Sequence, residues 1–315
     1  VLCAKGSSGL MQHLSPSKLK KPMLRSGPRG SGEFNEIEWD DALLLATQWL
    51  SEVRNDDPKK LAFFTGRDQS QSLTGWWASQ FGTPNHAAHG GFCSVNMAAA
   101  GLYTVGGSFW EFGEPDWELT KYFMMFGVAE DHDSNPIKAG LGKLKTKGDA
   151  KFLSVNPVRT GYSAIADEWV GIKPGTDGMF IGALLHELIN AGKIDFEYLS
   201  RYTNAAWLVI NNPNTENHGL FARDHSGNPL CFDSLSNAIV NAENIKVSPK
   251  LVGEYSLKDG TKVTPSFELF AKRFAGEEFS PEKASKITGI SQKDIKRIAF
   301  EVAEAAFEKE VVLNV

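Results

Sequence analysis

The chain has 315 residues, of which 42% are hydrophobic and 23% charged, and its formal net charge is −5. These values are typical of a globular protein of about two domains with a large core, and the mild acidity argues against a nucleic-acid partner. The three cysteines lie too far apart in sequence to suggest a disulfide framework. No apolar run is long enough to cross a bilayer.

The first part of the chain predicts coil followed by an α/β unit. Residues 1–35 are rich in glycine, serine, proline and basic residues, which indicates coil laid over another part of the molecule. A helix is expected from Asp40, its candidate N-cap, because apolar residues then recur at helical spacing. Residues 60–65 predict a short buried strand and residues 70–81 a second helix, an order typical of α/β proteins.

Cys93 follows two glycines in the run His89–Met97. Glycines allow the backbone to approach a bulky partner closely, and a thiolate is a soft ligand for a heavy metal. A buried cysteine that acts as a small apolar side chain is the alternative interpretation.

Residues 121–128 predict a buried strand, and a helix follows over 136–146. A strand, a short loop and a helix form the geometry that places a phosphate at a helix N-terminus. The intervening loop lacks the spaced glycines of a nicotinamide dinucleotide site. Its acidic run 130–133 matches no standard metal spacing, so a solvated turn is favoured over a metal cluster.

The next predicted strand, 151–155, ends at Asn156. A polar side chain at the carboxyl end of a parallel strand lies in the ligand crevice of an open α/β sheet. Residues 168–172 predict another strand, from which a tight turn leads into a helix over 178–191. Asp177 in this turn either caps that helix or accepts a hydrogen bond from an amino group of a ligand.

The remaining residues continue the alternation of helices and strands. The expected elements are a helix over 195–202, an insertion of loops and short strands over 203–265, helices over 266–276, 281–286 and 291–306, and a strand over 310–315. The sequence ends within that last predicted strand, so we expect this chain to be a fragment of a longer polypeptide. The predicted fold class is α/β, with open, mostly parallel sheets of dinucleotide-binding (Rossmann-like) topology.

Several motifs share the order that they have in one known family. Cys3–Gly6 looks like the end of a cluster-binding motif, and Ile37–Ala42 is similar to the family's "isWdeAl" opening. Residues 156–160, Asn-Pro-Val-Arg-Thr, stand where the family usually has Asp-Pro-Arg-x-Thr, and residues 173–177, Lys-Pro-Gly-Thr-Asp, match a family turn. In this order the motifs resemble the dimethyl-sulfoxide-reductase family of molybdenum or tungsten bis(pyranopterin guanine dinucleotide) oxidoreductases.

The resemblance implies roles for individual residues. Cys93 would be the protein ligand to molybdenum or tungsten, and Cys3 would be the last ligand of a [4Fe–4S] cluster whose other ligands precede Val1. Lys5 would lie on the electron path between the cluster and a pterin. The residues implied to hold one guanine dinucleotide are Gly127, Val128, Glu130, Asp131, Asn135, Asn156, Pro157, Arg159, Pro174, Gly175 and Asp177. Asn156 departs from the family's aspartate, which weakens any role as a carboxylate that binds ribose hydroxyls.

The residue after Cys93 bears on the substrate. Ser94 argues against formate dehydrogenases, which typically have histidine there. The run Gly90–Gly101 most resembles members that oxidise sulfite to sulfate and pass electrons through an iron–sulfur cluster toward quinone. The alternatives are reduction of polysulfide, thiosulfate or tetrathionate, a scaffold subunit of this fold without the metal, and an unrelated nucleotide-binding protein.

The resemblance also implies domains and partners. Residues 1–35 would end an iron–sulfur domain, residues 36–88 would belong to a second domain, and residues 89–315 would form a dinucleotide-binding domain, truncated at its C-terminus and carrying the 203–265 insertion. The expected partners are a small inorganic sulfur anion, a membrane anchor subunit, and an iron–sulfur electron-transfer subunit. These would hold the protein at the membrane, with the cytoplasmic face favoured over the periplasmic one.

Overall fold

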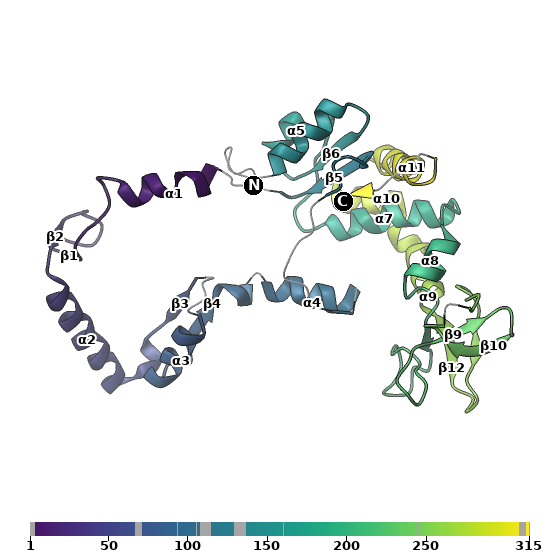
Figure 1. Cartoon of the computed structure of the whole chain (residues 1–315), viewed down its shortest axis with the longest axis horizontal. Helices are drawn as coiled ribbons and strands as arrows, with labels where there is room; N and C mark the ends of the chain where they lie inside the picture. Colours follow the sequence, from purple (N-terminus) through teal and green to yellow (C-terminus); the bar gives the residue numbers. More distant parts are fainter. Residues whose placement is uncertain are drawn as a thin grey trace. The chain divides into compact units, whose positions relative to one another are not determined.

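The computed structural model describes residues 4–66, 71–92, 94–104, 106–107, 115–128, 137–159, 161–244, 246–308 and 313–314. The chain forms two compact units, residues 2–114 and residues 115–315, coloured along the sequence in Figure 1. In the stretches given above, no helix is long and apolar enough to span a membrane. The domain boundaries expected after residues 35 and 88 remain predictions.

The N-terminal unit combines helices with two small two-stranded sheets. The antiparallel pair β1–β2 and the parallel pair β3–β4 are its sheets. In chain order its elements are α1 (Ala4–Leu14), β1 (Met23–Arg25), β2 (Phe34–Glu36), α2 (Trp39–Asp56), η1 (Pro58–Lys60), β3 (Phe63–Thr65), α3 (Gln71–Phe81), β4 (His86–Ala88), η2 (His89–Phe92) and α4 (Ser94–Thr104).

Three expectations for this unit need correction. Residues 1–35 are not all coil, because α1 and β1 form within them. Asp40 is not the N-cap of α2, because the extended residue is Glu38, whose carbonyl accepts the first helical hydrogen bond from Ala42 N at 3.0 Å. The strand β3 is not buried, since Phe64 is 71% exposed. The helix expected over 70–81 is confirmed as α3.

The C-terminal unit is built on a four-stranded parallel sheet in the order β13-β5-β6-β7. Its strands are β5 (Tyr122–Phe126), β6 (Lys151–Val155), β7 (Glu168–Val170) and β13 (Leu313–Asn314). Crossovers α5 (Ile137–Lys147) and α6 (Tyr162–Ile165) join the first three strands. The expected α/β class and its mostly parallel strands are therefore confirmed.

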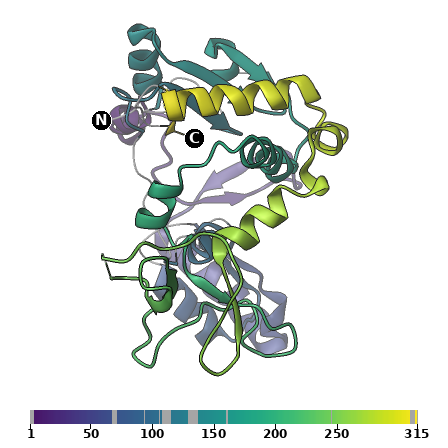
Figure 2. The same ribbon diagram turned by 90° about the vertical axis from the view of Figure 1, so that its right-hand side faces the viewer.

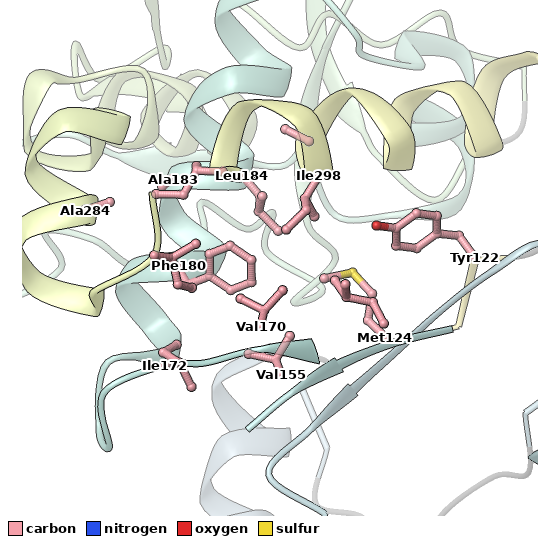
Figure 3. Close-up of a cluster of buried hydrophobic side chains, with 14 of the residues drawn as sticks. Tyr122, Met124, Val155, Val170, Ile172, Phe180, Ala183, Leu184, Ala284 and Ile298 are labelled. Atoms are coloured by element: carbon pink, nitrogen blue, oxygen red, sulfur yellow. The ribbon is translucent and has the colours of Figure 1, made fainter. Parts of the chain in front are cut away.

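Successive residues of β5 point to opposite faces of this sheet. Tyr122 and Met124 join a cluster with α7 (Asp177–Asn190), α10 (Pro281–Thr288) and α11 (Gln292–Glu308). Figure 3 shows Phe180, Leu184 and Ile298 of these helices converging on Met124 and Val155 of the sheet. The helices α7 and α11 pack against each other over this face and cross at a steep angle (Figure 1 and Figure 2).

The opposite face is covered by α5. Phe123, Met125 and Phe152 pack there against Leu141 and Leu144, which are fully buried. The helix approaches closely because Gly140 has no side chain: a Cβ at this position would lie 2.1 Å from the ring of Trp117. With both faces covered, every residue of β5 and β6 is buried except Phe126 and Lys151, as is typical of parallel sheets.

A network of charges closes the amino edge of the sheet. Glu301 on α11 accepts hydrogen bonds from the Tyr122 hydroxyl at 2.8 Å, from Lys151 Nζ at 2.6 Å and from Arg297 Nη1 at 2.8 Å. Glu168 pairs with the same two cations. Burial alone would raise the pKa of Glu301, but the donated hydrogen bonds outweigh it and hold this pKa below its ordinary value.

The insertion contains short strands, as expected, and these strands pair in an antiparallel manner. It follows α8 (Phe196–Tyr202) and contains β8 (Leu208–Ile210), β9 (Leu230–Asp233), β10 (Ala238–Asn241), β11 (Tyr255–Ser256) and β12 (Lys262–Pro265), and then α9 (Ser266–Phe274) and η3 (Glu277–Phe279) lead to α10. Asp233 organises one turn of it, because its carboxylate accepts hydrogen bonds from the backbone N–H groups of Leu235, Ser236 and Ser248.

Removing the charge at Glu301 should destabilise the C-terminal unit. We expect Glu301→Gln to lower the free energy of unfolding by about 1–3 kcal/mol, because charge-assisted hydrogen bonds to Lys151 and Arg297 are lost. Urea unfolding measures the change. The matched control is Glu282→Gln on α10, which breaks an exposed pair with Lys286 and should have a clearly smaller effect. Equal effects of the two variants would contradict the assigned role of the network.

Asp233 should make the insertion sensitive to acid. Hydrogen bonds from Ser236 and Ser248 lower the pKa of its carboxyl to about 2, against about 3.9 in an unfolded chain. Its stabilising effect is therefore complete above pH 4 and is lost as the pH falls toward 2. We expect the stability difference between the native chain and Asp233→Asn to shrink over that range in denaturant titrations.

Candidate functional site

The carboxyl ends of the parallel strands place three loops at one edge of the C-terminal sheet. The loops begin at Gly127 after β5, at Asn156 after β6 and at Gly171 after β7. Because β13 and β6 lie on opposite sides of β5, the strand order reverses at β5, and ligands of open α/β sheets bind at such a point. This carboxyl edge, defined by the three loops, is the candidate site.

The loop after β5 begins with a residue in the left-handed backbone conformation. Gly127 has φ +59° and donates its N–H to the Val155 carbonyl at 3.0 Å, which extends the ladder by one bond. Among the described residues, a Cβ at Gly127 would meet nothing within 4 Å, so these residues leave space beside the backbone. Val128 is half-buried against the α5 face. Glu130, Asp131 and Asn135 lie outside the described residues.

The loop after β6 is fixed by Asn156. Its backbone N–H donates to the Val170 carbonyl at 3.1 Å, and its side-chain Oδ1 accepts from Val158 N at 3.1 Å. The oxygen is therefore committed to the turn, while Nδ2 has no acceptor among the residues described. An aspartate at this position would present a second acceptor, whereas this asparagine presents a donor. Pro157 follows on the exposed surface.

Arg159 lies in the same loop, and Trp169 of β7 holds it. The guanidinium carbon lies 5.9 Å from the centroid of the Trp169 ring, within the range of a cation–π contact. Trp169 Nε1 also donates to the Asn156 carbonyl at 2.9 Å. Trp169 is not among the site residues expected from the sequence. The sequence feature that could have indicated it is a large aromatic residue beside a polar strand end.

The turn after β7 leads to Asp177. Gly175 has φ +77°, and Lys173 N donates to the Thr288 carbonyl at 2.9 Å, which anchors the turn to the end of α10. Pro174 and Gly175 are both exposed. The residue at the N-cap of α7 is Thr176 and Asp177 is the first helical residue, so the capping role considered for Asp177 is wrong.

The Asp177 carboxylate is half-buried and has no partner among the described residues. It is thus available to accept from donors of a ligand. A cation at Arg159, donors at Asn156 and an acceptor at Asp177 match the charges of a nucleotide, whose phosphates are anionic and whose base carries N–H groups. The edge therefore has the chemistry of a nucleotide site.

The residues expected to bind metal belong to the N-terminal unit. Cys3 and Cys93 lie outside the described residues, and Lys5 is in α1 without a described side chain. The strand that leads to Cys93 is described: β4 ends at Ala88, paired in parallel with Thr65, and η2 follows. Within the stretches that the structure describes, no group of three or more histidine, cysteine or acidic side chains could hold a metal ion.

Comparisons with known proteins indicate a single family for this chain. A family model described as "Molybdopterin oxidoreductase" matches residues 18–256. One sulfite dehydrogenase subunit, from Allochromatium vinosum, is 49% identical over 100% of this chain and 33% of its own length. The thiosulfate reductase molybdopterin-containing subunit PhsA of Salmonella typhimurium is 31% identical over 64% of this chain and 26% of its own.

A comparison of structures gives the same fold. Acetylene hydratase from Pelobacter acetylenicus superposes with a TM-score of 0.56 at 17% identity, over 100% of this chain and 34% of that one. The chain thus spans about a third or less of the length of these relatives.

Two glycines near the turn should respond oppositely to alanine. Gly175→Ala should cost about 1–2 kcal/mol, because a Cβ is disfavoured at its positive φ. Gly178→Ala should stabilise the chain by up to about 1 kcal/mol, because this residue is in α7 with open space around it. Urea unfolding of both variants measures the signs, and shifts in the same direction would contradict the described turn.

Proposed function

The chain belongs to the molybdopterin oxidoreductase family, and from this premise we propose that the full-length protein oxidises sulfite to sulfate. The observation that carries the proposal is 49% identity with a sulfite dehydrogenase subunit over the whole of this chain. The run Gly90–Gly101 supports it, because this run most resembles sulfite-oxidising members of the family.

Reduction of thiosulfate or a related sulfur compound is the second candidate. It is favoured by the 31% identity with a thiosulfate reductase subunit. Both candidates have an inorganic sulfur anion as substrate and differ in the direction of electron flow.

The family implies a molybdenum–pterin cofactor, and the residues of the carboxyl edge fit a guanine dinucleotide form of it. Guanine carries ring and amino N–H donors, which the Asp177 carboxylate would accept. The Arg159 guanidinium and Asn156 Nδ2 would donate to phosphate and ribose oxygens. Gly127 and Gly175, beside whose Cβ positions the structure has open space, would let the ligand approach the backbone. The other residues proposed to line this site are Val128, Glu130, Asp131, Asn135, Pro157 and Pro174.

We propose Cys93 as the thiolate ligand of molybdenum or tungsten. When bound, the metal centre would supply two-electron oxygen-atom or sulfur transfer. Cys3 would bind a [4Fe–4S] cluster together with cysteines outside this chain, and the ammonium of Lys5 would lie between the cluster and the pterin. The proposed partners are a membrane anchor that meets the quinone pool and an iron–sulfur subunit, with the protein at the cytoplasmic face.

Replacing Cys93 tests both ligand and substrate. In the full-length protein, Cys93→Ala should abolish sulfite-dependent ferricyanide reduction and leave the circular dichroism spectrum unchanged. The matched control is Cys231→Ala in β9, which should keep activity. Burial raises the pKa of the Cys231 thiol to about 11, so it stays protonated and does not serve as a ligand.

Two other results would change the proposal. Full activity of Cys93→Ala with unchanged metal content would overturn the ligand assignment. A molybdenum-containing native protein that does not oxidise sulfite, but oxidises reduced methyl viologen with thiosulfate, would favour the second candidate.

A further inference from the structure

Trp169 joins the loops that follow β6 and β7. Its indole N–H donates to the Asn156 carbonyl at 2.9 Å, and its ring lies within cation–π range of Arg159. The ring also covers the backbone of Gly171, where a Cβ would approach Trp169 Cη2 to 2.9 Å. The Trp169 side chain therefore contacts Asn156 and Arg159 in the loop after β6, and Gly171 at the start of the loop after β7.

The way in which Arg159 is held affects what it can bind. Its side chain is exposed and has no carboxylate partner among the described residues. An aromatic ring attracts a guanidinium without accepting its N–H groups in conventional hydrogen bonds, whereas an ion pair would use them and neutralise the charge. The five donors of Arg159 thus remain available to an anion while its position is restrained.

The position of this arginine departs from the family pattern. The pattern Asp-Pro-Arg-x-Thr has arginine third, whereas residues 156–160 have Val158 third and Arg159 fourth. A shift of one residue turns a side chain to another side of a loop, so an arginine at the fourth position needs its own support. Trp169 provides that support from the neighbouring strand.

We propose that Trp169 is a positioning residue that fixes the loop after β6 so that the Arg159 guanidinium meets a phosphate of the guanine dinucleotide. The inference rests on the proposed function, because it assumes that the nucleotide binds at the carboxyl edge. Trp169 acts through Asn156 and Arg159 and need not touch the ligand.

The test measures how fast the full-length holoprotein loses its guanine nucleotide. Wild type and variants are warmed mildly and gel-filtered, and the GMP released from the retained cofactor by acid hydrolysis is quantified per polypeptide. Trp169→Phe keeps a ring face but removes the N–H, and should speed the loss about threefold. Trp169→Leu removes both contacts and should speed it about tenfold.

A double variant separates positioning from a general structural effect. If Trp169 acts through Arg159, Trp169→Leu combined with Arg159→Ala should speed the loss by clearly less than the product of the single effects. Gly171→Ala displaces the ring without removing it and should also speed the loss.

The chain contains a matched control outside the edge. Trp207 lies 6.0 Å from the guanidinium of Arg223 in the insertion, and Trp207→Leu breaks this pair. It should leave the rate of nucleotide loss unchanged. Three results would overturn this inference but leave the proposed function standing. They are an equal acceleration of nucleotide loss by Trp207→Leu, multiplicative effects in the double variant, and unchanged rates of loss in both Trp169 variants. A wild-type holoprotein without GMP would overturn the proposed form of the cofactor, and the inference with it.

Discussion

The constraint on which the C-terminal unit depends is that a parallel sheet must be covered on both faces. Parallel strands need crossover connections, which here are helical, so covering the faces and joining the strands are achieved by the same segments. Phe152 and Phe180, both fully buried, mark the two faces. Parallel pairing also sends all carboxyl ends to one edge, and the site lies at this edge because the loops that follow the strands meet there.

The two edges of the sheet therefore have different chemistry. At the amino edge, Lys151, Glu168 and Glu301 satisfy one another, and burial together with the hydrogen bond to Glu301 raises the pKa of the Tyr122 hydroxyl. At the carboxyl edge, Arg159 and Asp177 have no ion-pair partner among the described residues. Satisfied charges stabilise a fold, whereas unpaired charges at a strand edge are available to a ligand. The proposed binding of a guanine dinucleotide at the carboxyl edge agrees with this division of roles.

The sequence predicts those features that depend on neighbouring residues. The strands around Tyr122 and Phe152 were predictable because continuous apolar runs are typical of buried parallel strands. The helix α1 was missed, because glycines and serines favour coil and local propensity is a weak guide. The N-cap of α2 lies two residues before the expected one, since Asp40 suits the first turn as well as the cap. The partner of Tyr122 could not be found from the sequence, because Tyr122 and Glu301 are 179 residues apart.

The pairing of β13 with β5 has a consequence for how the molecule assembles. Leu313 pairs with Tyr122 across about 190 residues of chain, and contacts of such sequence separation form late in folding. The strands β5, β6 and β7 are joined by short crossovers and can associate first. The strand order reverses at β5 only after β13 has paired with β5. We therefore expect the candidate site at the carboxyl edge to be completed after most of its sheet, so that loading of a large ligand follows folding of this unit.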